Sequence, residues 1–274
     1  MATNTSETVP VSASADARTD RTDTPWQHPL VLRLLSVVAV CGAWEWGGWY
    51  PISPSFPPFS ATMAASCEML ASGELVRAFW ITLQPLAIGL VISALAGIAA
   101  GVAMGLNRLT EWLGAPVFIV LQSAPLAALV PMLTLVYGIG LTSKVLVVCI
   151  MAMPVIVLNS YNAVRHTPAS LVEMGRMFQA SRRQLILRVI LPSASPVIFA
   201  GLRLGAAAGF IGAILAELLI TPTGIGDIIT YNQSIADYAK MYSAILSVIV
   251  FSVLFIEILE RIEVTVFRPE RRGG

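Results

Sequence analysis

The sequence predicts an all-α membrane protein with six transmembrane helices. Of its 274 residues 56% are hydrophobic and only 12% are charged, which is about half the charge of a soluble domain of this size. No charged residue occurs between Arg77 and Arg108, between Glu111 and Lys144, or between Lys144 and Arg165. Because about 20 apolar residues suffice to cross a bilayer, each of these stretches is long enough to span a membrane.

The N-terminal part is predicted to contain a tail, one span and a surface helix. Residues 1–29 are rich in Thr, Ser, Ala and Asp, a composition that buries too little apolar surface to fold, so we expect a disordered tail. The first span, 30–50, ends in a cluster of Trp and Tyr typical of a membrane interface. Several prolines follow, and residues 60–76 are predicted to form a helix on the outer surface. Residues 30–74 thus supply one span and an external helix.

Two of the remaining spans carry small residues at every fourth position. The second span, 85–106, and the fifth span, 197–220, both show this pattern. Small residues at that spacing let two helix backbones approach closely, although chance in a Gly-rich and Ala-rich helix is an alternative explanation. The residues predicted to pack helices are Gly97, Gly101, Gly105, Gly205 and Gly209.

Polar residues inside the spans are candidates for a translocation path. The third span, 113–137, contains three prolines with Gln122 and Ser123 at mid-depth, and such groups are tolerated where they face protein or a wet cavity. The fourth span, 145–161, contains Asn159, the fifth contains Glu217, and the sixth is 242–260. A carboxylate in an apolar segment is costly. Glu217 is therefore interpreted either as a gate or packing residue at the end of the path or as a residue already at the interface.

The polar loop 165–196 is the longest interruption in the second half of the chain. It contains five arginines, and Ser170 with Glu173 has the spacing of a capping box at a helix start. Ser181 is predicted to cap a second short helix, which Pro192 would end. Two short, basic, amphipathic helices favour a docking surface. The alternative is a solvated loop whose charge only fixes the topology.

This loop resembles the EAA loop of permease subunits of ATP-binding-cassette importers. The pattern Glu-Ala-Ala, three residues, Gly, nine residues, Ile, one residue, Leu-Pro has its anchors here at matching spacing. The matching positions are Glu173, Met174, Gly175, Gln179, Val189, Leu191 and Pro192. Gln179 replaces the usual glycine, whose freedom to adopt a positive φ lets the chain turn between the two helices.

The resemblance implies a type I importer permease fold in which a short cytoplasmic coupling helix contacts an ATPase. Residues 75–262 would be a five-helix core that includes the coupling loop, and 263–274 a cytoplasmic tail. Ser170 and Glu173 would shape the coupling helix, while Leu191 and Pro192 would end the loop. The apolar contact would come from Met174, Met177 and Phe178, and the polar rim from Arg176, Arg182 and Arg183.

The distribution of basic residues predicts the orientation. With six spans and both termini in the cytoplasm, only Arg77, Lys144 and Lys240 of the 17 Lys and Arg residues lie outside, as the positive-inside rule requires. The resemblance to importer permeases implies a bacterial plasma membrane, where lipid surrounds the chain.

The sequence has no P-loop, because neither lysine lies in a Gly-Lys-Ser/Thr motif. The three cysteines and two histidines have no metal-binding spacing, so we expect no metal, no cofactor on this chain and no nucleic-acid partner. The resemblance implies two ATP-binding subunits that hold ATP and Mg, an extracytoplasmic solute-binding protein, and a second permease copy, as a homodimer. The solute would be a small anion such as a sulfonate, taurine or nitrate, or a vitamin precursor. An ion-coupled carrier and a non-transporting membrane scaffold are the alternatives.

Overall fold

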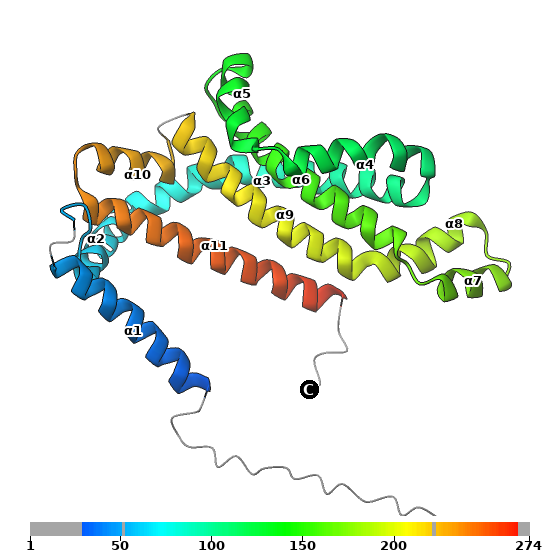
Figure 1. The fold of residues 1–274 in the computed structure, drawn as a ribbon, viewed down its shortest axis with the longest axis horizontal. Helices are drawn as coiled ribbons and strands as arrows, with labels where there is room; N and C mark the ends of the chain where they lie inside the picture. The colour runs from blue at the N-terminus through cyan, green and yellow to red at the C-terminus, as the bar shows by residue number, and fades with distance from the viewer. Residues whose placement is uncertain (1–28, 51–52, 221–222, 268–274) are drawn as a thin grey trace, which may run out of the picture.

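The structure is a computed structural model, and it describes residues 29–50, 53–220 and 223–267. The described residues form helices joined by turns, in an elongated arrangement (Figure 1). One end carries the short helices α7 and α8, and we call it the loop end. The opposite end carries α2 and α10, and we call it the cap end. The predicted N-terminal tail lies outside the described residues as far as residue 28.

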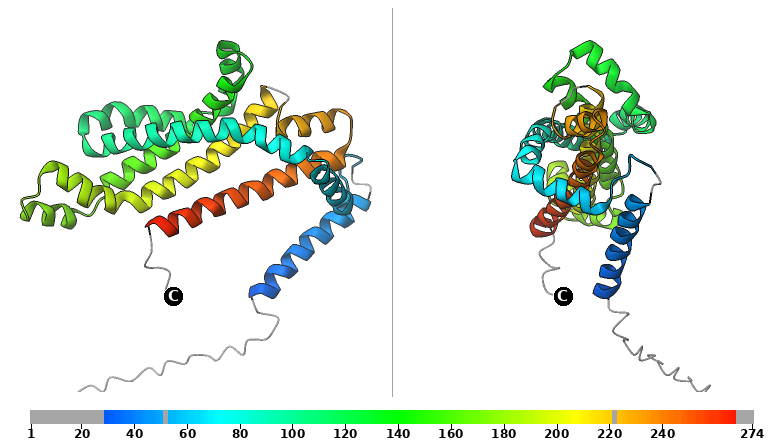
Figure 2. Two further views of the ribbon diagram at one scale, coloured as in Figure 1. Left: turned by 180° about the vertical axis from the view of Figure 1, so that it is seen from behind. Right: turned by 90° about the vertical axis from the view of Figure 1, so that its left-hand side faces the viewer.

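Three long helices build the core, with the middle one packed between the other two: α3 (Glu74–Leu106), α6 (Leu141–Arg165) and α9 (Leu191–Leu219). The central helix α6 contributes Val148, Ala152 and Ile156, each at most 1% exposed. A helix that is apolar all round suits such a central position. Figure 2 shows α9 running alongside α6 from the loop end to the cap end.

Glycines on α3 and α9 allow both helices to approach α6. A Cβ built on Gly97 or Gly205 would lie 2.9 or 2.3 Å from side-chain atoms of Ile156. Gly105 faces Val164 in the same way, and Gly209 faces Leu90 of α3. The five predicted packing glycines therefore all lie at contacts within the core.

Gly101 lies against the backbone of α6. We expect Gly101→Ala to lower the thermal unfolding midpoint of the purified protein in detergent, because the new Cβ would lie 2.5 Å from the backbone oxygen of Val157. A backbone oxygen cannot move aside by a change of rotamer, so the free energy of unfolding should fall by about 1–3 kcal/mol. Gly42→Ala is the control, since nothing lies within 4 Å of that position. Equal midpoints for the two variants would contradict this packing.

Four further helices lie outside this core: α1 (Pro29–Trp49), α2 (Phe59–Ala71), α10 (Ile225–Ser234) and α11 (Tyr238–Phe267). Trp44 connects α1 to the cap end, with ring centroids 5.6 Å from Phe59 and 6.0 Å from Tyr242. Residues predicted as one surface helix, 60–76, divide between α2 and the start of α3, because Gly73 has a φ of 75° and ends the first helix.

The prediction of one continuous third span is wrong. The chain there forms α4 (Arg108–Ser123), a 3₁₀ turn (Leu126–Leu129) and α5 (Val130–Tyr137). Pro125 explains the break, since it disfavours the helical conformation of Ala124, which is extended with a ψ of 147°. Figure 1 shows α5 turned away from the direction of α4.

Among the described residues, four helices are long and apolar enough to cross a membrane: Glu74–Leu106, Leu141–Arg165, Arg182–Leu219 and Tyr238–Arg261. They correspond to the predicted second, fourth, fifth and sixth spans. The predicted first span is α1, and the third is divided between α4 and α5. The structure therefore establishes an all-helical membrane protein with four clear spans.

Candidate coupling surface and translocation cavity

The loop end is formed by two short helices, α7 (Ala169–Met177) and α8 (Arg182–Leu185). Pro168, and not Ser170, is the N-cap of α7, so the predicted capping box at its start is wrong. Because the helix begins at Ala169, the Ser170 side chain is already inside the first turn. The capping box occurs at α8 instead, where the Ser181 side chain accepts from Gln184 N–H and Gln184 Oε1 accepts from Ser181 N–H.

Gln179 makes the turn that a glycine usually makes. Its φ is 54°, in the left-handed region that side chains other than glycine occupy rarely. Two hydrogen bonds close α7 around it, from Gln179 N–H to Arg176 O (2.9 Å) and from Ala180 N–H to Gly175 O (3.1 Å). This is the bonding pattern of a Schellman motif. The turn geometry is thus retained despite the substitution.

The helix after Ser181 does not end at Pro192, as predicted, but continues into α9. Five residues of π-helix, Ile186–Ile190, connect α8 to α9. Leu191 N–H donates to Ile186 O, five residues back. The backbone hydrogen bonds have therefore already changed from the i−4 to the i−5 carbonyl before Pro192. Proline lacks a donor but fits the first turn of a helical segment, which is where Pro192 lies.

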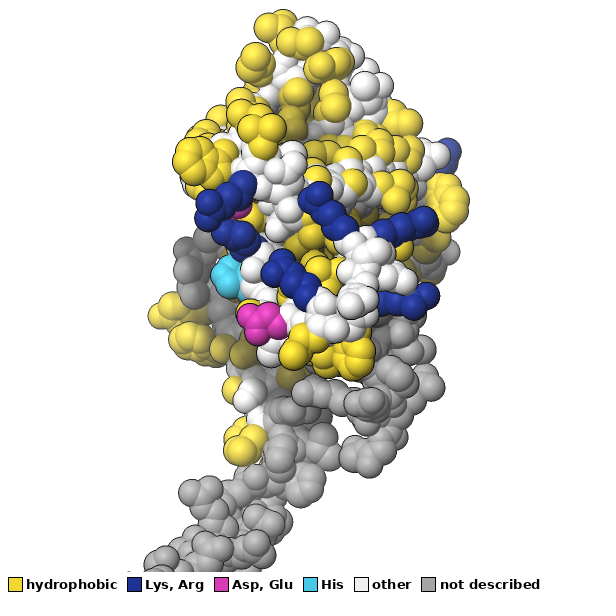
Figure 3. All heavy atoms as spheres, turned by 90° about the vertical axis from the view of Figure 1, so that its right-hand side faces the viewer, with side chains coloured by type: hydrophobic (Ala, Val, Ile, Leu, Met, Phe, Trp, Pro, Cys, Tyr) yellow, Lys and Arg dark blue, Asp and Glu magenta, His cyan; other side chains and the backbone are white. Residues whose placement is uncertain are grey.

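Large apolar side chains of α7 are exposed on this polar end. Met177 is 85% exposed, Phe178 81% and Met174 48%, whereas Gly175 is buried against Leu185 and Val189. Figure 3 shows basic side chains gathered around this end, with apolar side chains among them. The exposed residues that form the basic and polar rim are Arg165, Arg176, Arg182, Arg183, Arg188 and Glu173. Exposed apolar groups ringed by charge are typical of a protein-binding surface.

A polar contact fixes the base of this loop to the core. The Tyr161 hydroxyl donates to Glu111 Oε1 (2.7 Å), and Arg165 Nε lies 3.8 Å from the same oxygen. Tyr161 and Arg165 are in the last turns of α6, whereas Glu111 is in the first turn of α4. These contacts therefore connect the last turns of α6, just before the loop, to the first turn of α4.

The break after α4 borders a cavity. Gln122 lines a cavity of about 340 Å³ together with Ala124, Pro125, Met151, Pro154, Val155 and Ala208. Pro154 lies inside α6, where its missing N–H leaves the carbonyl of Ile150 without its usual helical donor. Irregular backbone at membrane depth is tolerated where it lines such a cavity.

The other residues predicted for the path lie elsewhere. The Ser123 hydroxyl donates to the Ile119 carbonyl, 2.8 Å away, and Ser123 is exposed next to Gln122. The Asn159 amide donates to the Val155 carbonyl at 2.8 Å, and its Cβ packs against Gly201. Glu217 is buried at the cap end of α9 and is paired with Lys144 at 3.7 Å. The structure therefore brings Gln122 alone of these four to the lining of the cavity.

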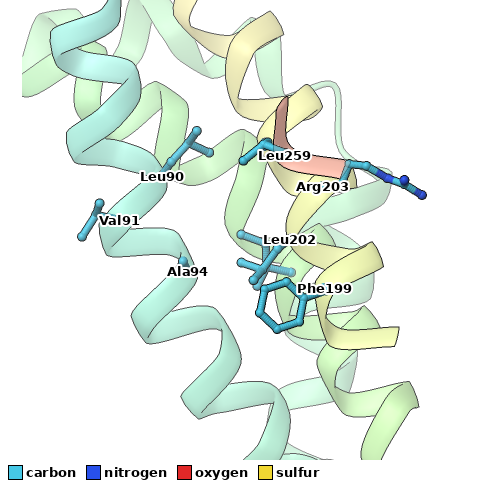
Figure 4. Close-up of a pocket in the computed structure, with 9 residues that line it drawn as sticks. Leu90, Val91, Ala94, Phe199, Leu202, Arg203 and Leu259 are labelled. Carbon is cyan, nitrogen blue, oxygen red and sulfur yellow. The ribbon is translucent and has the colours of Figure 1, made fainter. Parts of the chain in front are cut away.

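A second hollow, of about 250 Å³, lies between α3 and α9. Leu90, Val91 and Ala94 face Phe199 and Leu202 across it, while the Arg203 side chain extends away from it (Figure 4). Arg203 is paired with Glu260 of α11 at 3.1 Å. The apolar walls of this hollow between α3 and α9 suit acyl chains better than a polar solute. In the described part of the chain, no group of three His, Cys, Asp or Glu side chains could hold a metal ion.

Comparison with known proteins agrees with this architecture. The family model described as binding-protein-dependent transport system inner membrane component matches residues 77–267. The putative aliphatic sulfonates transport permease protein of Bacillus subtilis (strain 168) is 29% identical over 83% of this chain and 84% of its own. The taurine transport system permease protein of Escherichia coli (strain K12) is 30% identical over 53% of each chain.

The fold also matches a solved structure. An inward-facing form of the MetNI methionine ABC transporter aligns with a TM-score of 0.59 at 21% identity, over 71% of this chain and 96% of the matched chain. The chain therefore belongs to the binding-protein-dependent transport system inner membrane components, the permease subunits of ATP-binding-cassette importers, in which a separate subunit binds and hydrolyses ATP.

Proposed function

We propose that α7 is the coupling helix of this permease. The observation that carries the proposal is the exposure of Met177 and Phe178 on a basic end of the molecule, away from the long apolar spans. Aromatic and Met side chains are enriched at the centres of protein interfaces, and charged groups are common at their rims. Seated in a groove of each ATPase, α7 would follow the closure of the ATPase pair and carry α4 and α6 with it as a rigid body.

Orientation supports this arrangement. The loop end carries most of the exposed arginines, whereas the cap end carries Arg77 and Lys240. By the positive-inside rule the loop end faces the cytoplasm, where the ATPase is, and the cap end faces outward. Six spans with both termini inside would follow if α1 is the first span and the broken α4–α5 segment the third.

The cavity beside Gln122 is the proposed solute path. Discontinuous helices near mid-membrane commonly supply the solute contacts of transporters, because their free backbone groups are polar. Two copies of the chain would enclose one path between them. The side-chain amide of Gln122 and the backbone around Pro125 are neutral, hydrogen-bonding groups suited to a small polar solute.

The cavity predicts a blocking substitution. We expect Ala208→Phe to reduce uptake by about tenfold or more, because an aromatic ring would project from the lining into a cavity of only about 340 Å³. The matched control is Ala207→Phe, one residue away on a different face of α9, beside Phe210 and Ile211. Normal uptake by Ala208→Phe, with blocked uptake by Ala207→Phe, would place the path on the other face.

The proposed solute is a small anion of the sulfonate, taurine or nitrate kind, or a vitamin precursor. The sulfonate and taurine permeases to which this chain is similar support this class. Glu217 would not repel such an anion in the cavity, because Lys144 pairs with it at the cap end. Specificity would come largely from the external binding protein that delivers the solute.

An uptake assay in cells tests the proposal and its alternatives. Labelled taurine, an alkanesulfonate and nitrate are offered in turn to cells that express the chain with the ATPase and binding protein encoded nearest to it. Uptake that stops when ATP is depleted but survives an ionophore supports the importer. The reverse dependence would indicate an ion-coupled carrier, and no ATPase capture with no uptake would indicate a scaffold.

A further inference from the structure

A buried acid and a buried base meet at the cap end. Glu217 in the last turn of α9 is 1% exposed, and Lys144 in the first turn of α6 is 5% exposed. Lys144 Nζ lies 3.7 Å from Glu217 Oε1. An isolated charge at such a position would be costly, and removal of one partner from a buried pair leaves such a charge behind.

The second oxygen of Glu217 extends the contact to other elements. Oε2 accepts hydrogen bonds from the Thr82 hydroxyl of α3 (2.9 Å) and from the Gly226 N–H of α10 (3.1 Å). The Thr82 hydroxyl also accepts from Ile225 N–H (3.2 Å), and Lys144 Nζ donates to the Thr223 hydroxyl. One carboxylate therefore connects α3, α6 and α9 to residues 223–226.

Two glycines let residues 223–226 wrap around this carboxylate. Gly224 has a φ of 76°, and a Cβ there would lie 2.2 Å from Glu217 Oε1. A Cβ on Gly226 would lie 2.5 Å from the Cβ of Glu217. Both positions thus exclude a side chain, and Gly224 also needs the backbone freedom of glycine.

The segment held in this way shapes the outward surface. α10 presents Tyr231 and then Ile235 to the outside, each more than half exposed. Beside it lies a cavity of about 540 Å³ whose lining includes Arg77 of α3, Thr223 and Asp227. The position of α10 therefore decides the shape of the cap end.

We propose that Lys144 and Glu217 are positioning residues that lock α10 to the core, so that α10 moves with α3, α6 and α9 as one body. The consequence for transport rests on the proposed function: a fixed α10 gives the external binding protein one defined surface on which to release its solute. The lock itself rests only on the contacts described above. Apolar packing by Ile225 and Ile228, both buried, is the competing explanation for the position of α10.

Hydrogen–deuterium exchange of the full-length protein in detergent separates the two explanations. Lys144→Met leaves Glu217 buried without a base, so we expect amide exchange in residues 223–234 to rise by about tenfold or more while the middle of α6 is unchanged. Lys144→Met combined with Glu217→Gln removes both charges and should exchange more slowly than Lys144→Met alone. Lys240→Met is the matched control, since it breaks an exposed pair with Glu68 (3.2 Å) at the same end.

Two outcomes overturn the lock: exchange in residues 223–234 within about twofold of the unsubstituted protein, or an equal rise along the whole chain. If Lys144→Met does not fold, Thr82→Val replaces it, because this change removes the bonds to Glu217 and Ile225 but keeps both charges. Exchange at 225–226 should then rise several-fold, and unchanged exchange would contradict the proposal. Uptake is measured separately. If the unsubstituted protein carries none of the tested anions, the proposed function fails, while the exchange result still decides the lock.

Discussion

Replacing Gly175 by glutamate is expected to abolish ATP-driven uptake while the chain still inserts into the membrane. Gly175 is the buried residue of α7, and a Cβ there would lie 2.7 Å from Leu185 Cδ1. A longer, charged side chain cannot remain in this contact, so α7 must move off α8. Overpacking of this kind costs about 1–3 kcal/mol, which corresponds to a loss of about fivefold to 150-fold in the population of molecules whose α7 is correctly placed.

The matched control is Gly175→Ala. Its single methyl group meets the end of the flexible Leu185 side chain and makes an ordinary contact with Val189. Because Gly175 is also helical, near-normal uptake is expected. Uptake and membrane content are measured together in cells. Normal uptake by Gly175→Glu at normal membrane content would show that the position of α7 does not matter for transport.

Replacing Met177 and Phe178 together by aspartate is expected to prevent capture of the ATPase. Met177 and the C-cap residue Phe178 are the most exposed large apolar residues at α7. If each acts as an interface hot spot of about 2 kcal/mol, affinity should fall by about a thousandfold. Co-purification of the ATPase with the tagged chain in detergent, at several salt concentrations, measures the loss.

Leucine at both positions is the control, because it keeps apolar surface at the same place and should retain the ATPase. The salt series distinguishes the contribution of the apolar contact from that of the arginine rim, because only exposed charge pairs weaken as the salt concentration rises. Capture of the ATPase by the aspartate variant as strong as by the unsubstituted chain would remove α7 from the interface.

The loop was largely predictable because its signals are local. The spacing of capping and apolar residues predicts the two short helices. Ser181 is predictable as the N-cap of the second helix from the residues that follow it. The predicted start of α7 is two residues too late, because Pro168 and not Ser170 is the N-cap. The continuation through Pro192 was missed, because a π-helical segment depends on the ladder before it and has no simple sequence signature.

The break in the third span was missed although its cause was visible. Prolines inside a span are tolerated where they face protein or a wet cavity, but Pro125 also disfavours the helical conformation of Ala124. Hydrophobicity is continuous across the break and therefore hides it. The cavity beside Gln122 could not be predicted, because Met151 and Ala208 reach it from other helices.

The pair of Lys144 and Glu217 was also missed. The positive-inside rule predicts only that Lys144 lies on the outer side, and the residues next to Glu217 do not indicate its partner. Gly224 and Gly226 were the available signal, because two closely spaced glycines after an acid indicate a close approach of backbone. Their partner could not be identified, since the contact joins residues far apart in the chain.

Photo-crosslinking from Phe178 tests the central claim most directly. A photoreactive phenylalanine analogue is introduced at Phe178 or, as a control, at the exposed Tyr231 of the cap end, and membranes containing the assembled importer are irradiated. If α7 is the coupling helix, a product with the summed mass of the chain and one ATPase forms from position 178 and not from 231. No such product from 178, or equal amounts from both positions, would contradict the assignment.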